Sequence, residues 1–152
     1  MVIDDEIRAG GGSPDRESRQ RVGNEIHLVK GQRWLCEKVL ERVNGKEFIV
    51  IDGLRFPEDH AYFAEAFGAR FLHVHIASSD EVRRVRYNSI SPGDIPFEAA
   101  NDQPVEAEIE RLAPLASATI ANESTLGELE NAIVGCVRDH GPKDTGCLLK
   151  SS

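Results

Sequence analysis

The sequence predicts an α/β fold built from βαβ units around a largely parallel sheet. Short apolar runs at 47–52, 70–76 and 118–121 have the length of buried strands. They alternate with longer segments in which apolar residues recur at helical spacing. The chain has 152 residues, of which 40% are hydrophobic and 29% charged, and this composition is typical of a soluble globular domain.

The N-terminal third is predicted to be helical after a polar start. Segment 1–14 is rich in glycine, and we expect it to be mobile. From Asp15 the pattern fits either two helices or one helix bent at Gly31, and Asn44-Gly45 ends it. The apolar positions are Val22, Ile26 and Val29, followed by Leu35, Val39 and Val43.

The rest of the chain is predicted to alternate between strands and helices. After the strand at 47–52, Pro57 begins a helix that continues to about Phe67, with Phe63 and Phe67 inward and Gly68 as the C-cap. The later elements are a strand at 70–76, a helix capped at Ser79, a loop over 90–104, a helix at about 105–113, a strand at 118–121 and an amphipathic helix from Thr125. We expect a folded domain over 15–140 and a disordered tail over 141–152.

Composition restricts the class of partner. The net charge of −8 argues against nucleic acid as the main partner, although a local arginine cluster can still hold a small anion. The apolar runs are too short to cross a bilayer, so no membrane partner is expected. The cysteines are Cys36, Cys136 and Cys147, and their spacing fits neither a zinc site nor a disulfide framework. We therefore expect reduced thiols in a cytoplasmic protein.

Asp52 and Arg55 are the first candidate site residues, because they follow the apolar run at 47–52. Ligands of open α/β sheets bind beyond the carboxyl ends of parallel strands. There an arginine can hold a phosphate, and an aspartate can polarise a water or the shell of a magnesium ion. The alternative, equally open at this point, is that Asp52 caps a turn and Arg55 is a solvated loop residue.

Arg83 and Arg86 lie three residues apart on the helix that begins near Ser79, with Arg84 between them. Several guanidinium groups beside a loop can neutralise the charge that develops during phosphoryl transfer. A solvated helix face is the commoner explanation of such a run. Arg16 could hold a second phosphate at the start of the first helix. His73 and His75 share one face of a strand, but no third ligand is evident, so packed or hydrogen-bonded histidines are favoured over a metal site.

Four segments together resemble the P-loop nucleoside monophosphate kinase superfamily, in particular its deoxynucleoside monophosphate kinases and dephospho-CoA kinases. The resemblance covers about residues 15–138. It rests on the order and spacing of these segments: Arg16-Glu-Ser-Arg-Gln-Arg-Val-Gly-Asn24, Ile51-Asp-Gly-Leu-Arg-Phe-Pro-Glu58, the pair Arg83 and Arg86, and Asn101-Asp-Gln-Pro-Val-Glu106 followed by Ala116-Ser-Ala-Thr-Ile-Ala-Asn122 and Leu126.

The resemblance implies a three-layer sandwich with a mostly parallel sheet, and transfer of the ATP γ-phosphoryl group to a nucleotide-type acceptor with the help of Mg²⁺. It also implies that Arg16 and Arg55 bind the acceptor phosphate and that Arg83 and Arg86 contact phosphates near the lid, with Asp52 as an auxiliary acid.

The chain departs from this family in its phosphate loop. The motif Gly-x-x-x-x-Gly-Lys-Ser/Thr and the strand before it are absent from the sequence. In the family that strand lies between those expected at 47–52 and 70–76. Its absence implies open strand edges, or a second copy or partner chain that completes the sheet.

Two hypotheses follow. In the first, the chain is the C-terminal two-thirds of a nucleotide or dephospho-CoA kinase-like protein, with little or no kinase activity by itself. In the second, it is a non-catalytic nucleotide-binding or interaction module. A third interpretation is a generic α/β domain whose arginines are only surface charge.

Overall fold

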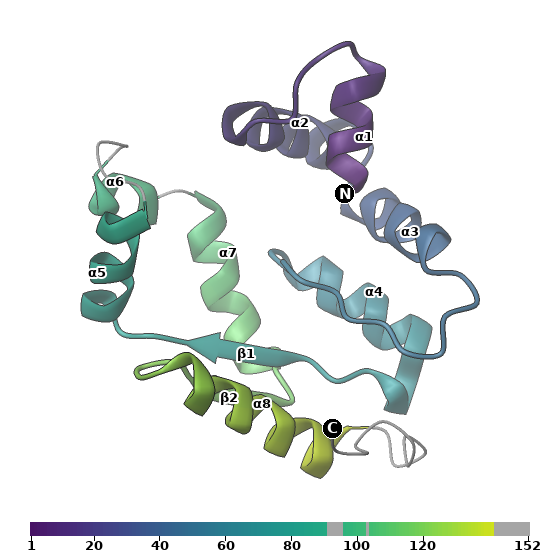
Figure 1. Ribbon diagram of the computed structural model, residues 1–152. Coiled ribbons are helices and arrows are strands. Elements are labelled where there is room, and N and C mark those ends of the chain that lie inside the picture. The colour runs from purple at the N-terminus through teal and green to yellow at the C-terminus, as the bar shows by residue number, and fades with distance from the viewer. Residues whose placement is uncertain (91–95, 103, 142–152) are drawn as a thin grey trace. The chain divides into compact units, whose positions relative to one another are not determined.

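The computed structural model describes residues 1–90, 96–102 and 104–141, and the side chains of all of these except 16 and 104–106. The protein is mixed α/β and mostly helical (Figure 1). It forms two compact units, Met1–Leu54 and Arg55–Ser152, and each unit is described by itself. None of the described helices has the length and apolar character needed to cross a membrane.

The first unit consists of three helices that contact one another, α1 (Val2–Ala9), α2 (Arg16–Val29) and α3 (Gln32–Arg42). All three helices contribute to its core, with Val2 and Ile7 from α1, Ile26 from α2 and Cys36 from α3. The Asp15 side chain caps α2 by accepting a hydrogen bond of 2.7 Å from the backbone N–H of Ser18. The sequence was compatible with two helices or with one bent helix. The structure has two helices, which are separated where Gly31 takes a φ of +81°.

Helix α1 lies where the sequence pattern predicts a mobile segment over 1–14. It has eight residues, and its buried apolar residues are Val2 and Ile7, with acidic residues between them. Contacts with α2 stabilise it. Asp4 is buried, and its carboxylate accepts a hydrogen bond of 2.7 Å from the Arg19 guanidinium, which lowers the Asp4 pKa. Ile7, 3% exposed, packs into the core from the same helix.

The second unit contains a short parallel sheet of two strands, β1 (Val74–Ala77) and β2 (Ala118–Ala121). Val74 is the register partner of Ala118, and Ala77 is the partner of Ala121. Helix α8 (Leu126–His140) contacts β2 and runs alongside the strands (Figure 1). The other elements are α4 (Pro57–Phe67), η1 (Gly68–Arg70), α5 (Asp80–Ile90), α6 (Phe97–Asn101), α7 (Pro104–Leu112) and η2 (Ala113–Leu115).

Local sequence signals predict the helices of this unit well. Helix α4 begins at Pro57 and is followed by Gly68 as its C-cap, as expected. Thr125 caps α8, because its hydroxyl and the backbone N–H of Glu128 are hydrogen-bonded while the Glu128 carboxylate accepts from the Thr125 N–H at 3.1 Å. The predicted strand at 118–121 is confirmed as β2.

Three predictions about the chain between helices are wrong in whole or in part. Residues 47–52 form no strand: Phe48 is 49% and Val50 79% exposed. The strand predicted at 70–76 is confirmed only in part, because η1 extends to Arg70 and β1 spans Val74–Ala77. Helix α6 lies inside the loop predicted over 90–104, of which 91–95 and 103 are outside the described residues. The tail predicted to be disordered also lies outside them from residue 142.

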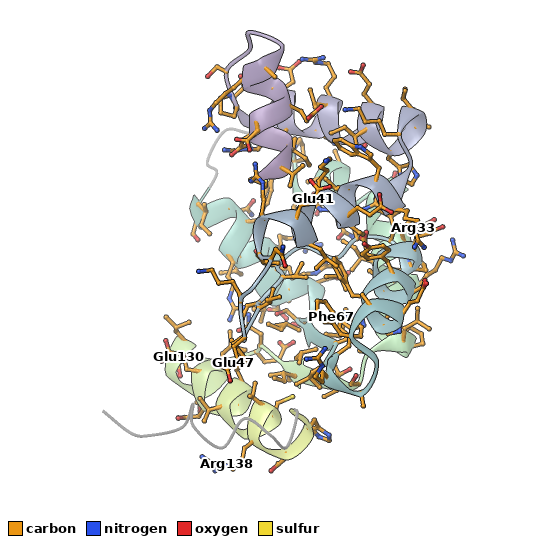
Figure 2. The ribbon with its side chains drawn as sticks, turned by 90° about the vertical axis from the view of Figure 1, so that its right-hand side faces the viewer. Arg33, Glu41, Glu47, Phe67, Glu130 and Arg138 are labelled. Carbon is orange, nitrogen blue, oxygen red and sulfur yellow. The ribbon has the colours of Figure 1, made fainter. Side chains whose placement is uncertain are left out.

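The core of the second unit lies between α4, α7 and the sheet. Phe63 on α4 and Leu112 on α7 are its largest fully buried side chains, each 2% exposed, and α4 contacts α7. The Phe67 ring, labelled in Figure 2, stacks against Phe63 with ring centroids 6.4 Å apart. Both Phe63 and Phe67 were predicted to point inward, and the structure buries Phe63 fully and Phe67 partly. This packing positions the residues that precede α4 and follow the two strands.

Candidate functional site

Two serines and a glutamate gather where β1 and β2 end. Because the strands are parallel and in register, Ser78-Ser79 and Asn122-Glu123 leave the sheet at the same edge. The Ser78 hydroxyl donates to the Asn122 carbonyl at 2.8 Å. The Glu123 carboxylate accepts from both the backbone N–H of Ser79, at 2.5 Å, and its hydroxyl, at 2.8 Å. These hydrogen bonds occupy the polar groups at this edge of the sheet with partners from the protein itself.

Arg86, which was predicted to contact a phosphate, joins α5 to the loop after β2. Its Nη1 donates to the Asn122 carbonyl at 2.9 Å, and its Nη2 donates to the Ser124 carbonyl at 3.1 Å. Carbonyl oxygens that lie at a partly buried edge need donors, and a guanidinium supplies two in a rigid plane. The role that the structure gives Arg86 is therefore to hold α5 against the loop that begins α8.

Replacing Arg86 with methionine, which keeps the aliphatic stem, should lower the free energy of unfolding by about 1–3 kcal/mol, because two backbone carbonyls lose a charged donor. Arg84→Met on the same helix is the matched control. Arg84 pairs with Glu98 on the surface, so this change should cost between about 0 and 1 kcal/mol. Urea unfolding followed by circular dichroism measures both. Equal effects of the two changes would contradict the assignment.

Arg83 and Arg84 also have partners, and both lie near one aromatic ring. The Arg83 Nη2 lies 2.6 Å from the Asp80 carboxylate, and the Arg84 Nε lies 3.1 Å from that of Glu98. Their guanidinium carbons are 5.7 and 5.5 Å from the centroid of the buried Phe97 ring. The ion pair between Arg84 and Glu98 and the cation–π attraction of both arginines to Phe97 hold α5 against α6.

A shallow depression of about 450 Å³ lies beside this cluster. Its lining includes Arg84 but also the carboxylates of Asp80, Glu98 and Asp102. Three carboxylates around one arginine make the local field unfavourable for a phosphate. The arginine run of α5 therefore resembles the solvated and paired helix face that the sequence left as the alternative.

Among the predicted site arginines whose side chains the structure describes, Arg55 keeps an uncommitted guanidinium. It is exposed, and within the described residues no ion pair or side-chain hydrogen bond engages its guanidinium. Its backbone N–H is held, because the buried carboxylate of Asp59 accepts from the N–H groups of Arg55, at 2.9 Å, and Phe56, at 3.0 Å. The backbone at Arg55 is thus fixed by the cap of α4, while its side chain remains open to solvent.

The remaining predicted site residues, Asp52 and Arg16, belong to the first unit. Asp52 is exposed near the end of Met1–Leu54. Arg16 is the first residue of α2, and its side chain lies outside the described part of the structure. Within the described residues, no group of three or more histidine, cysteine or acidic side chains is arranged to hold a metal ion.

His73 forms a pair with His60, and the sequence pointed to His73 but not to His60. His73 was expected to be packed or hydrogen-bonded, and its Nδ1 lies 3.0 Å from the Nδ1 of His60 on α4. Burial is the main cause that lowers the His73 pKa, and the charges of His60 and His75 lower it further. No pattern connects His60 to His73 in the sequence, because the contact depends on how α4 packs against the residues before β1.

A scan against models of known protein families, a search of curated proteins and a search of solved structures each found no match to this chain.

Proposed function

We propose that this protein is the acceptor-binding part of a nucleotide kinase-like fold, in which Arg55 binds the phosphate of a nucleoside monophosphate-type ligand. The observation that carries the proposal is the state of Arg55: its backbone is fixed by Asp59 while its guanidinium is exposed and uncommitted within the described residues. A fixed backbone with a free guanidinium is what binding of a phosphate by two parallel hydrogen bonds requires. The segment 51–58, on which the resemblance to these kinases rests, contains this residue.

The finer architecture of the proposal is a three-layer sandwich with a larger parallel sheet. Two observations support it. The strands β1 and β2 are parallel and joined through helices, which is a βαβ arrangement. The apolar segment 47–52 has the composition of a buried strand but is exposed at Phe48 and Val50. A strand from outside the given sequence, or from a partner chain, would offer a pairing partner to segment 47–52 and to β1.

Transfer of a phosphoryl group is not proposed for this chain by itself. The residues present do not fit Mg²⁺–ATP: the sequence lacks the phosphate loop, Arg86 is bonded to two carbonyls, and Arg83 is paired with Asp80. We therefore propose binding of the acceptor phosphate by Arg55, with Asp52 nearby in the sequence as an auxiliary acid. A cytoplasmic location, where free thiols stay reduced, belongs to the same proposal.

Calorimetric titration with nucleoside monophosphates and dephospho-CoA tests this proposal. We expect micromolar binding that Arg55→Ala weakens about tenfold or more, since a hydrogen bond to a charged group contributes about 1.5–3 kcal/mol. Arg55→Lys should keep only part of the affinity, because an ammonium group cannot make the two parallel bonds. Arg70→Ala is the matched control, because Arg70 is another exposed arginine of the same unit.

Two outcomes would overturn the proposal. Absence of binding to every mononucleotide tested would remove the acceptor site. ATP- and Mg²⁺-dependent phosphorylation of an acceptor by this chain alone, in a coupled assay, would contradict the claim that it binds without transferring.

The second candidate function is an interaction module that recognises another protein chain. The observation in its favour is the exposure of Phe48 and Val50 within a run of four apolar residues. Titration distinguishes the two, because an interaction module without an acceptor site binds no mononucleotide and is insensitive to Arg55→Ala.

A further inference from the structure

Two imidazole rings meet between α4 and the segment that enters β1. The Nδ1 atoms of His60 and His73 are 3.0 Å apart, and the ring centroids are 5.1 Å apart. His73 is 8% exposed, so its ring is removed from water. The distance is that of a hydrogen bond, which means that one Nδ1 carries a proton and the other accepts it.

The contact needs a single proton between the two rings. Either ring can supply it, because a neutral imidazole carries its proton on one of its two nitrogens. The hydrogen bond therefore forms when one Nδ1 is protonated and the other Nδ1 is bare.

This arrangement tolerates one added proton but not two. When one ring becomes an imidazolium, its Nδ1–H donates to the bare Nδ1 of the other ring, and the hydrogen bond is kept. When both rings are protonated, two N–H groups face each other and the hydrogen bond is lost. We propose that the His60–His73 pair is a proton-sensitive contact, which holds α4 against the strand pair while at least one of the two rings is neutral and releases it when both are protonated.

The surroundings of the pair make the second proton costly. The Phe71 ring lies 5.4 Å from that of His60 and 6.3 Å from that of His73, and it also contacts the buried Phe63. Aromatic neighbours exclude water and do not compensate a buried charge within the plane of the imidazole. Two ligands alone do not make a metal site, and within the described residues no third ligand joins them.

Few other titratable groups lie on the elements around the pair. The partly or fully buried ones are Asp59 and Tyr62 on α4, His75 on β1 and, among the described side chains of α7, Glu108. Asp59 is occupied by the cap of α4, and Glu108 pairs with Arg111 at 2.8 Å. Arg70 in η1 is exposed, while η2 and β2 carry no titratable side chain. His60 and His75 are the groups whose charges act on His73.

The sign of the pH dependence follows from the lowered pKa of His73. Below the ordinary histidine pKa of about 6.5, the unfolded chain takes up a proton at this position that folded His73 does not. The free energy of unfolding therefore falls as the pH falls through this range. Above the ordinary pKa this contribution is constant. The local consequence is that α4 and the segment before β1 open first on acidification.

The proposal is tested by NMR titration of the five histidine rings of the full chain, together with amide hydrogen exchange at about pH 7.5 and about pH 5, on either side of the histidine range. We expect the pKa of the His73 ring to lie below the ordinary histidine value. Acidification should reduce the protection of α4 amides, corrected for intrinsic rates, more than that of α8 amides.

Variants separate the pair from general acid effects. His73→Leu removes the buried titratable ring, so the selective loss of α4 protection should disappear. His140→Gln, at the exposed end of α8, is the control and should leave it intact. A His73 ring with an ordinary pKa, or an unchanged loss of α4 protection in His73→Leu, would overturn the proposal. If His73→Leu does not fold, the ring titration of the unmodified protein decides alone.

Discussion

Replacing Phe63 with alanine is expected to lower the free energy of unfolding by about 3–5 kcal/mol. Phe63 is 2% exposed and contacts the rings of Phe67 and Phe71 at centroid distances of 6.4 and 6.3 Å. Truncation would remove the buried ring from the centre of the second unit and leave a cavity that the packed helices can fill only in part. Because a domain is stable by only about 5–15 kcal/mol, this single change could unfold the unit.

Urea unfolding followed by circular dichroism measures this effect, and Phe48→Ala is the matched control. Phe48 is 49% exposed, so its truncation should change the free energy of unfolding by no more than about 0.5 kcal/mol. A loss of similar size in both variants would mean that Phe63 is not a core residue, or that Phe48 is covered in solution.

The second large effect is expected in the first unit. Ile26 is 4% exposed, and Ile26→Ala should cost about 2–5 kcal/mol, because it removes a buried side chain from the centre of three helices. Trp34 on α3 is the only tryptophan of the chain, so its fluorescence reports on this unit. We expect the fluorescence transition of Ile26→Ala at lower urea than that of the unmodified protein.

Leu28→Ala on the same helix is the control for this measurement. Leu28 is 81% exposed, and its truncation should leave the Trp34 transition within about 0.5 kcal/mol of the original. An unshifted fluorescence transition in Ile26→Ala would contradict the assignment of this core.

The elements that the sequence predicts correctly are those with strong local signals. Pro57 and Gly68 bracket α4, and Thr125 with Glu128 begins α8. Caps and fixed dihedral angles act within one helical turn, so they can be recognised without knowledge of the tertiary structure. Helix α1 has no side-chain N-cap, and its contacts with α2 include the hydrogen bond from Arg19 to Asp4.

The strand predicted at 47–52 shows the opposite case. Its apolar composition is that of a buried strand, but a strand exists only when another backbone pairs with it. Segment 118–121 has such a partner in β1, and segment 47–52 has none within the described residues. Composition indicates which segments can pair but not whether a neighbour is present.

The candidate site also has features that the sequence indicates and features that only the packing shows. The sequence picks out arginines as candidates for binding a phosphate, but it cannot show which of them are already engaged. Arg86 is bonded to the carbonyls of Asn122 and Ser124, which lie far from it in the sequence, and Arg83 pairs with Asp80 on its own helix. Only the packing of α5 against the end of β2 distinguishes Arg86 from Arg55.

By itself, the sequence determined the helices with strong local signals, the short strand at 118–121 and the choice of Arg55 as a candidate for binding a phosphate, because each depends on propensity, capping or side-chain chemistry within a few residues. The tertiary structure alone decided which apolar run pairs, which arginines remain free and that His60 meets His73. These outcomes depend on contacts between segments distant in the chain, whose free energy comes from burial and from satisfying polar groups that the fold removes from water.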